Sequence, residues 1–391
     1  MRRPATEALP VVPFARPDIG EAEIAAVVHA LREGWVTTGP AAAEFEDAFS
    51  AFMGNGVEAV AVSSATAGLH LALEACGIGP GDEVIVPTWT FTATAEVVRY
   101  LGATPVLVDV EPRTLNIDRA AFAAAMTPRT RAVIVVHFAG LAADTAGIAA
   151  LAREHGLKVI EDAAHALPSS RDGELVGAAG QADATVFSFY ATKAVTTGEG
   201  GMLTTRDPGI AARVRIMRLH GIDRDAFDRY RRSSAWSYDV IAPGFKNNLP
   251  DPAAAMGRVQ LARAHAMRDQ RERIAGRYLD GWADLPLELP SRAALGDLHS
   301  WHLFTIRLRA DSGIGRDAFI DALAQRGIGS SVHFIPLHRL TYWRRSLHFA
   351  PDAFPVADEV FPRIVSVPVF SAMADSEVER VTRAVREVLE A

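Results

Sequence analysis

Short runs of apolar, mostly β-branched residues alternate along the first half of the chain with segments of helical pattern. Seven such runs are typical of strands, and they lie at 59–63, 83–87, 105–109, 132–136, 158–162, 184–189 and 201–205. Because most of these runs are apolar throughout, we expect a mostly parallel sheet that helices cover on both faces. Only a short glycine-rich segment separates the last two runs, too short for a parallel crossover, so we expect an antiparallel step there.

The second half of the chain has a different pattern, in which a long helix leads to a smaller unit of mixed helices and strands. Helices are expected at 66–75, 145–155, 253–272, 316–325 and 376–390, and strands of the smaller unit at 301–308 and 328–334. We therefore predict an α/β fold in two domains. The large domain (1–250) holds a mostly parallel seven-stranded sheet flanked by helices, and 251–391 form a linking helix and a small C-terminal α+β domain.

Composition narrows the classes of function. The chain has 391 residues, 49% hydrophobic and 22% charged, which suits one large domain and a smaller one. A net charge of −7 with interspersed signs argues against a face that binds nucleic acid. The most apolar stretch, 132–143, contains His137 and is too short to span a bilayer. No apolar signal core follows Met1, and the single cysteine, Cys76, suits a reducing compartment, so we expect a cytoplasmic protein without nucleic-acid or membrane partners.

A carboxylate and a lysine stand at the ends of two predicted strands. Asp162 ends the run 158–162, and Lys193 follows the run 184–189 just before the glycine-rich segment 197–201. Pyridoxal phosphate (PLP) chemistry needs such a pair: the lysine forms a Schiff base, and the carboxylate keeps the pyridinium nitrogen protonated. In apolar surroundings the pKa of Lys193 should be depressed, which would help this residue to carry protons.

Each of these residues also has a plainer interpretation. Lys193 is then an exposed loop lysine, although the glycines after it allow backbone to approach a ligand closely. Asp162 is then a metal ligand, a ribose contact or half of a structural ion pair. His165 orients Asp162, contacts a cofactor or is a structural histidine. We expect no bound metal.

Hydroxyl and aromatic residues follow two earlier strands. Small hydroxyl residues in Ser63–Gly68 open a helix, and such a helix N-terminus binds a phosphate or simply carries a Ser/Thr cap. The segment Pro87–Thr94 follows the next strand at its carboxyl end, where ligands of α/β sheets bind. Its aromatic side chains either stack on a flat ring or belong to the core. Each signal is weak alone, and their order along the chain strengthens them.

In this order the segments resemble the DegT/StrS-type sugar-nucleotide aminotransferases, which are PLP enzymes with the aspartate aminotransferase fold (fold type I). The similarity runs from Gly34–Pro40 to the closing helix, nearly the whole chain. It implies that Lys193 forms the Schiff base with PLP, that Asp162 pairs with the pyridine nitrogen and that His165 lies beside the cofactor near O3′. Phe91 matches the aromatic residue that stacks on the ring.

The resemblance also implies how the phosphate group of the cofactor is bound. The residues that match its binding cup are Ser64, Ala65, Thr66 and Ser188, with alanine where the family usually has glycine. Asn248 matches an asparagine that the family donates to the phosphate of the partner subunit, which implies a homodimer with a shared active site. Lys246 matches a basic residue of the same loop.

The implied reaction moves an amino group from L-glutamate to a keto-sugar nucleotide in two half-reactions. Lys193 favours transamination, because histidine replaces this lysine in the related sugar-deoxygenating enzymes. The segment Ser330–His338 resembles the form found in enzymes that aminate C4 of a 4-keto sugar, and the Tyr-Pro pair of the C3-acting branch is missing. We therefore favour C4 of an NDP-4-keto-6-deoxyhexose or a related 4-keto sugar. His333 and His338 are then substrate-binding residues or, alternatively, packed structural histidines.

Three alternatives stay open at this point. The chain is a C3-acting sugar-nucleotide aminotransferase, or another fold type I PLP enzyme whose Arg307 or Arg309 binds an amino-acid carboxylate. The third alternative is a catalytically silent binding protein, against which the intact Lys193–Asp162 pair argues.

Four arginines of an expected long loop either meet the diphosphate of the substrate or form a solvated face. They are Arg224, Arg229, Arg231 and Arg232.

Overall fold

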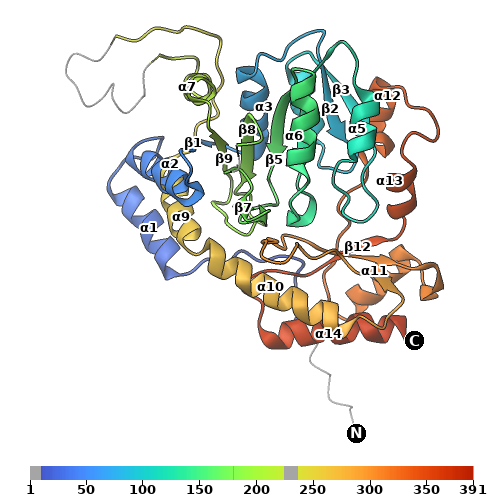
Figure 1. Cartoon of the computed structure of the whole chain (residues 1–391). Coiled ribbons are helices and arrows are strands. Elements are labelled where there is room, and N and C mark those ends of the chain that lie inside the picture. The colour runs from blue at the N-terminus through green and yellow to red at the C-terminus, as the bar shows by residue number, and fades with distance from the viewer. Residues whose placement is uncertain (1–9, 179, 224–236, 391) are drawn as a thin grey trace.

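The computed structural model describes residues 10–178, 180–223 and 237–390. Within these ranges a seven-stranded sheet and a smaller three-stranded sheet are surrounded by helices, with the smaller sheet at the bottom of the view in Figure 1. The four arginines expected to meet a diphosphate, Arg224, Arg229, Arg231 and Arg232, lie outside the described residues.

The large sheet contains the seven strands expected from the sequence. They are β1 (Glu58–Val62), β2 (Glu83–Pro87), β3 (Thr104–Val108), β4 (Thr130–Val136), β5 (Lys158–Asp162), β8 (Ala184–Ser188) and β9 (Gly201–Thr205). Their order across the sheet is β1-β9-β8-β5-β4-β2-β3. Neighbouring strands run parallel except at β9, which is antiparallel to both β1 and β8. The predicted α/β fold class and the antiparallel step after β8 are therefore confirmed.

Helices cover both faces of this sheet because successive side chains of a buried strand point to opposite sides. On β1, Val60 and Val62 pack with α3, α4 and α7, whereas Ala59 and Ala61 pack with aromatic residues of α2. On β2 and β4 the second face is covered by α5 and α6. The helices of this part are α1 (Glu21–Arg32), α2 (Pro40–Met53), α3 (Ala65–Ala75), α4 (Ala93–Tyr100), α5 (Arg119–Ala125), α6 (Thr145–Glu154), α7 (Pro208–Met217) and α9 (Asp251–Ala262).

The smaller sheet packs against three helices of the C-terminal part. Its strands, all antiparallel, are β10 (Leu287–Glu288), β11 (Phe304–Leu308) and β12 (Ile364–Val367). The helices that cover it are α10 (Ala264–Gly281), α11 (Arg316–Gln325) and α14 (Asp375–Leu389). In α14, Val378, Val381, Val385 and Val388 recur every three or four residues and form one buried stripe.

The remaining elements are short. The hairpin β6 (Ser170–Arg171) and β7 (Glu174–Leu175) follows β5, and α12 (Thr341–Ser346) and α13 (Pro355–Val360) return to the core of the large sheet. Single 3-10 turns lie at Phe138–Gly140, Ala310–Ser312 and Leu337–Arg339.

Three predicted elements differ from the structure. The helix expected at 253–272 is two helices, α9 and α10, which meet at Arg263, whose guanidinium is bonded to Asp18 and Glu23. The strand expected at 301–308 begins only at Phe304: Trp301 has a left-handed backbone with φ 48°, and the Leu303 N–H is bonded to the distant Ala139 carbonyl. The segment 328–334 forms isolated bridges to two other segments instead of a strand. In each case contacts with distant residues outweigh the local pattern.

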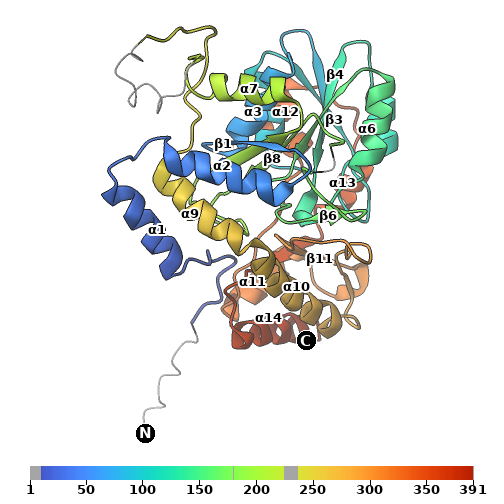
Figure 2. The same cartoon turned by 60° about the vertical axis from the view of Figure 1, so that its left-hand side comes forward.

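The sequence places a domain boundary at residue 250, and this division stays a prediction. Helix α9 packs beside α1 and α2 of the large-sheet part (Figure 2). Helix α10 continues the chain and packs against α14. Among the described residues, no helix is long and apolar enough to cross a membrane.

Candidate active site

Asp162 is the last residue of β5 and lies at the carboxyl end of the large sheet. Its side chain is buried, with Thr94 Oγ1 donating to Oδ2 at 2.8 Å and the Ala164 N–H donating to Oδ1 at 3.2 Å. Burial raises the pKa of Asp162, although these two hydrogen bonds and the charge of Lys193 oppose the shift. A buried carboxylate that is held by hydrogen bonds and has no ion pair of its own among the described residues is a good partner for a bound cation.

The neighbouring acid, Glu161, serves the opposite face of the sheet. Thr145 Oγ1 donates to Glu161 Oε1 at 2.7 Å, and His137 Nε2 lies 3.2 Å from the same oxygen. These contacts keep the pKa of Glu161 below its ordinary value in spite of burial. Strand alternation therefore sends only Asp162 to the side of Lys193.

Lys193 follows β8, the strand next to β5, in a turn closed by its N–H and the Tyr190 carbonyl at 2.9 Å. Its side chain is half-buried, and desolvation of the ammonium lowers the pKa of Lys193 to about 8, against the attraction of Asp162. The depressed pKa expected from the sequence is therefore present. An amine with such a pKa is partly neutral near pH 7 and carries protons in both directions.

Three rings gather beside these two groups. The His165 ring lies 4.3 Å from the His302 ring and is stacked on Phe334, with centroids 5.9 Å apart. His302 Nε2 is 3.4 Å from Lys193 Nζ. Burial and the charge of Lys193 hold the pKa of both histidines well below the ordinary value, so both are neutral at neutral pH. His165 Nδ1 and His302 Nδ1 are buried without a hydrogen-bond partner among the described residues.

The predicted phosphate cup is assembled from the start of α3 and the ends of two strands. Ser64 is the N-cap of α3 and accepts from the Ala67 N–H at 3.1 Å. The amides of Ala65 and Thr66 belong to the first turn and have no acceptor within the helix. Ser188 pairs with Gly201 across β8 and β9. A Cβ on Gly201 would lie 2.7 Å from the Ser64 carbonyl carbon, so this strand approaches the helix closely. The arrangement combines amides, hydroxyls and a helix dipole, the groups that bind an anion.

The loop that carries Lys246 and Asn248 lies beside this cup in the same chain. Asn248 pairs with Val62 at the end of β1, directly before the start of α3. Its side chain donates to Thr38 Oγ1 at 2.6 Å and accepts from Lys246 Nζ at 2.5 Å. Lys246 is therefore engaged with Asn248. The predicted role of Asn248 at the partner's phosphate stays a prediction.

The two aromatic residues after β2 have different surroundings. Trp89 is fully buried, and its indole N–H donates to the His333 carbonyl at 3.3 Å. Phe91 is 58% exposed, and its ring lies 5.9 Å from Phe334, the ring stacked on His165. Trp89 is thus a core aromatic, whereas Phe91 has an open face near His165, as a ring-stacking residue requires.

The two histidines predicted to bind substrate also differ. His333 stacks on Phe14, its Nδ1 lies 2.9 Å from Ser366 Oγ, and burial with the charge of Lys193 lowers its pKa to about 4. His338 has Nδ1 at 2.7 Å from Thr88 Oγ1 and Nε2 at 3.2 Å from Asp358. Both nitrogens of His338 are engaged within the protein, which favours the packing alternative for this residue.

Sequence reasoning missed three residues of this site: Thr94, His302 and Phe334. Thr94 ends the segment Pro87–Thr94, which was predicted to bind a ligand through its aromatic residues, but no local pattern indicates the hydrogen bond from Thr94 to Asp162. His302 lies within an apolar run read as a strand, and the signal was one polar residue among Trp301, Leu303 and Phe304. Its approach to Lys193 is a contact across 109 positions.

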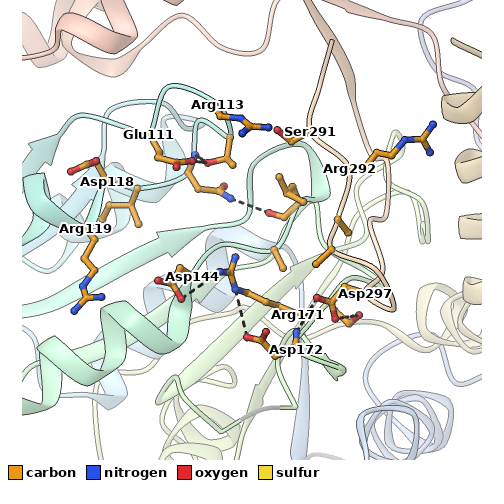
Figure 3. A pocket seen from close by; sticks show the side chains of 18 of the residues that line it. Glu111, Arg113, Asp118, Arg119, Asp144, Arg171, Asp172, Ser291, Arg292 and Asp297 are labelled. Carbon is orange, nitrogen blue, oxygen red and sulfur yellow. Dashed lines mark hydrogen bonds and ion pairs between the residues drawn. The ribbon is translucent and has the colours of Figure 1, made fainter. Parts of the chain in front are cut away.

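A broad cleft nearby does not contain this chemistry. It has a volume of about 910 Å³ and is lined by the loops after β3 and β4, the β6–β7 hairpin and residues 291–297 (Figure 3). Its lining carries charges of both signs, and some of them are engaged with neighbouring groups. Arg171 lies 3.7 Å from Asp144, and Asp297 accepts from the Gly173 N–H at 2.8 Å. Neither Lys193 nor Asp162 lines it.

The residues of the site fit PLP. Asp162 offers a buried carboxylate to a protonated ring nitrogen, and Lys193 offers an amine of low pKa to the carbonyl carbon. The start of α3 and Ser188 offer anion-binding groups for the phosphate. The orphaned Nδ1 of His165 supplies a hydrogen-bonding atom for a polar substituent of the ring. Among the described residues, no cluster of His, Cys, Asp and Glu has the form of a metal site.

Comparisons with known proteins agree with this site. The model of the DegT/DnrJ/EryC1/StrS aminotransferase family matches residues 17–386. The spore coat polysaccharide biosynthesis protein SpsC of Bacillus subtilis is 43% identical over 380 residues, 97% of each chain. Spr1654 of Streptococcus pneumoniae, described as a sugar aminotransferase and solved in its PMP form, is 34% identical. It superposes with a TM-score of 0.89 over 97% of this chain and 99% of its own. DesI, solved with its TDP-sugar product, is 33% identical with a TM-score of 0.84, covering 97% and 93%.

The fold and the site define a PLP-dependent aminotransferase of fold type I. The chain belongs to the DegT/DnrJ/EryC1/StrS aminotransferase family. The resemblance inferred from the order of the sequence motifs is confirmed, and so are the enzyme class and the cofactor.

Proposed function

We propose that this aminotransferase moves an amino group from L-glutamate to a keto-sugar nucleotide, with C4 of a 4-keto-6-deoxyhexose or a related 4-keto sugar as the favoured acceptor carbon. The observation that carries the proposal is that Asp162 ends β5 while Lys193 follows the adjacent strand β8 and lies within the electrostatic influence of Asp162, next to the start of α3. SpsC is named for polysaccharide biosynthesis and DesI was solved with a TDP-sugar product, which supports a sugar nucleotide as substrate.

Bound PLP supplies an electron-accepting ring and a carbon that takes up and returns the amino group. Asp162 holds the proton on the ring nitrogen, and Thr94 fixes the orientation of that carboxylate. The neutral amine of Lys193 takes a proton at Nζ from the donor α-carbon and gives it to the adjacent reacting carbon. At pH 7 roughly a tenth of an amine with a pKa of about 8 is neutral, so Lys193 is ready for this step.

The other residues bind and orient. Ser64, Ala65, Thr66 and Ser188 hold the phosphate group, and Phe91 and His165 lie against the ring system. His333, near the charge of Lys193, faces the acceptor sugar. We also propose a homodimer in which Asn248 reaches the phosphate group of the partner's site.

An enzyme that acts on amino acids needs an arginine to bind the carboxylate of its substrate. The two candidate arginines of this chain are already engaged, which disfavours such a substrate. Arg307 is bonded to the carbonyls of Pro112 and Arg113, and Arg309 is paired with Asp311 at 2.9 Å. Both guanidiniums are engaged within the protein. C3-acting transamination remains the second candidate, because the site residues that act on the cofactor serve either carbon.

Two experiments test the proposal. Purified wild type should show the absorbance band of lysine-bound PLP and lose it on addition of L-glutamate, and Lys193→Ala should show neither the band nor turnover. Turnover by the Lys193→Ala protein would contradict the assignment. A panel of 3-keto and 4-keto sugar nucleotides, with the aminated carbon identified by NMR, tests the acceptor; amination at C3 alone would replace C4 with the second candidate.

A further inference from the structure

A second imidazole, beyond His165, lies directly against the amine of Lys193. His302 Nε2 is 3.4 Å from Lys193 Nζ, and the side chain of His302 is buried, with 8% exposed. Its other nitrogen, Nδ1, is buried without a partner among the described residues. An unpaired buried polar atom is unfavourable, so packing alone is a poor account of this histidine.

The backbone around His302 is fixed independently of its ring. The Leu303 N–H donates to the Ala139 carbonyl at 3.2 Å, and Arg271 donates to the Trp301 carbonyl at 3.2 Å. Trp301 adopts a left-handed backbone with φ 48°, a conformation that is unfavourable for a bulky residue. The neighbouring contacts thus keep a strained turn that presents residue 302 to Lys193, and a change of the ring leaves these bonds in place.

The protonation states of the two groups are complementary. Burial and the positive charge of Lys193 keep the pKa of His302 far below its ordinary value, so the imidazole is neutral. A neutral imidazole has one acceptor nitrogen, and an ammonium has only donors. Nε2 therefore accepts from the protonated amine, and the ring proton resides on Nδ1.

We propose that His302 is a positioning residue for Lys193, whose ammonium it holds through Nε2 while Lys193 carries the proton between the two reacting carbons. This inference rests on the proposed role of Lys193. The proton moves from the donor carbon to Nζ and from Nζ to the second carbon, while His302 neither gains nor loses a proton. Without the acceptor, the ammonium is less stable and its direction is not fixed.

The test compares two substitutions that differ in the acceptor. In His302→Gln an amide oxygen replaces the acceptor nitrogen, whereas His302→Phe keeps a ring of similar size without one. We expect kcat to fall by about 10- to 100-fold in the Phe variant, with KM for L-glutamate changed by less than about 3-fold, because misplacement of a reacting group costs rate rather than binding. The Gln variant should recover most of the loss.

A second readout does not need the loaded enzyme. In the cofactor-free protein, the pH dependence of acylation of Lys193, followed by peptide mass spectrometry, gives the pKa of its amine. The midpoint should be near 8 in the wild type, lower in the Phe variant because the ammonium loses an acceptor, and restored in the Gln variant. Unchanged kcat together with an unchanged midpoint in the Phe variant would overturn the proposal.

Folding and the role of Lys193 are controlled separately. Thermal unfolding shows whether each variant is folded, and if the Phe variant is not, His302→Met asks the same question with a flexible apolar side chain. Lys193→Ala distinguishes the two ideas. If that variant keeps turnover, the proposed function fails, whereas an essential Lys193 with an insensitive His302 rejects only the present inference.

Discussion

Burial, rather than charge pairing, sets the protonation of the two central residues of the site. Lys193 lies near a carboxylate that favours its ammonium, yet its pKa falls to about 8 because desolvation outweighs this attraction. Asp162 is the converse case, since burial raises its pKa despite Lys193 and Thr94. Burial thus disfavours the charged form of both groups. This suits PLP, because its protonated ring nitrogen brings a positive charge to Asp162 and its carbonyl carbon requires a neutral amine from Lys193.

Replacing Lys193 by methionine should stabilise the cofactor-free protein at neutral pH. The folded-state pKa of Lys193 is about 8 and the ordinary value is 10.5, so below pH 8 the folded protein holds an ammonium that burial disfavours. The effect is at most about 3 kcal/mol, and partial exposure of the side chain reduces it. Between the two pKa values the unfolded chain binds more protons, so wild-type stability rises with pH through this window.

Urea unfolding of the cofactor-free proteins at about pH 7 and about pH 10 measures this effect. The Lys193→Met protein should be the more stable at the lower pH, with a smaller difference at the higher pH. Lys158→Met is a matched control, because Lys158 is paired with Asp183 at 2.7 Å, its pKa is raised, and its removal should lower stability. A difference for Lys193→Met that is independent of pH would contradict the depressed pKa.

Asp162→Asn should remove the electrostatic support of the ring nitrogen. We expect kcat to fall on the order of 10²- to 10³-fold, the range for losing one fixed electrostatic partner in a buried site. Thr94→Val removes only one hydrogen bond to the carboxylate, so its effect should be smaller, on the order of 10-fold. Single-turnover kinetics with L-glutamate measure both, and equal losses in the two variants would show that the charge of Asp162 is not the critical feature.

A residue of the site could be predicted from the sequence where its own neighbours in the chain mark it as unusual. Asp162 and Lys193 stand at the ends of apolar strands, where a charged residue conflicts with the pattern and draws attention. Thr94 and His302 reach the site through contacts across 68 and 109 positions. His302 is a polar residue in an apolar run, but neither residue's neighbours in sequence indicate its partner. Such contacts depend on the order of the strands, which the sequence pattern alone does not define.

At the scale of elements, the strands of the large sheet were predictable because they are buried on both faces and therefore apolar throughout. Helix α11, which begins at Arg316 and ends at Gln325, coincides with its expected range. Prediction failed at the α9–α10 junction, where Arg263 is bonded to Asp18 and Glu23 from the start of the chain. A helical pattern continues through such a junction, and only the tertiary bonds reveal the break.

Two helical glycines, one in α9 and one in α10, differ in the space around them, so replacement by alanine should have opposite effects on stability. A Cβ on Gly257 would lie 2.7 Å from the ring of Phe45, which is buried among other aromatics, whereas a Cβ on Gly276 in α10 meets nothing within 4 Å. Alanine gains about 1 kcal/mol over glycine inside a helix, and overpacking a rigid core costs about 1–3 kcal/mol. Gly257→Ala should therefore destabilise by about 1 kcal/mol, and Gly276→Ala should stabilise by up to about 1 kcal/mol.

Denaturant unfolding of the holoenzyme measures both glycine variants against the wild type. Because the contact on α9 also includes Thr197 Cγ2 at 2.9 Å, Gly257→Ala should further weaken PLP binding through the loop that follows Lys193. Gly276→Ala should leave PLP affinity unchanged. Stabilisation of the protein by Gly257→Ala would mean that Phe45 yields without strain and that the contact is not tight.

At the scale of the whole molecule, the site combines segments from both parts of the chain. Asp162 ends a strand of the large sheet and Lys193 follows another, whereas His302 and Phe334 belong to the segments around the smaller sheet. Asn248 forms a bridge with Val62 at the end of β1 in its own chain, near the start of α3. In a twofold-symmetric dimer, a loop at the subunit boundary serves either its own site or that of its partner, and complementation between variants distinguishes the two.

Mixing Lys193→Ala with Asn248→Ala subunits should restore activity if the site is shared. In the mixed dimer, one site would combine the intact Lys193 of one subunit with the intact Asn248 of the other. With random pairing, about half the dimers are mixed and each has one complete site, so about a quarter of the wild-type activity is expected after refolding of an equal mixture. Mixing Lys193→Ala with Asp162→Asn is the control, because both residues come from the same subunit and no complete site forms. Equal lack of recovery in the two mixtures would place Asn248 in the site of its own chain.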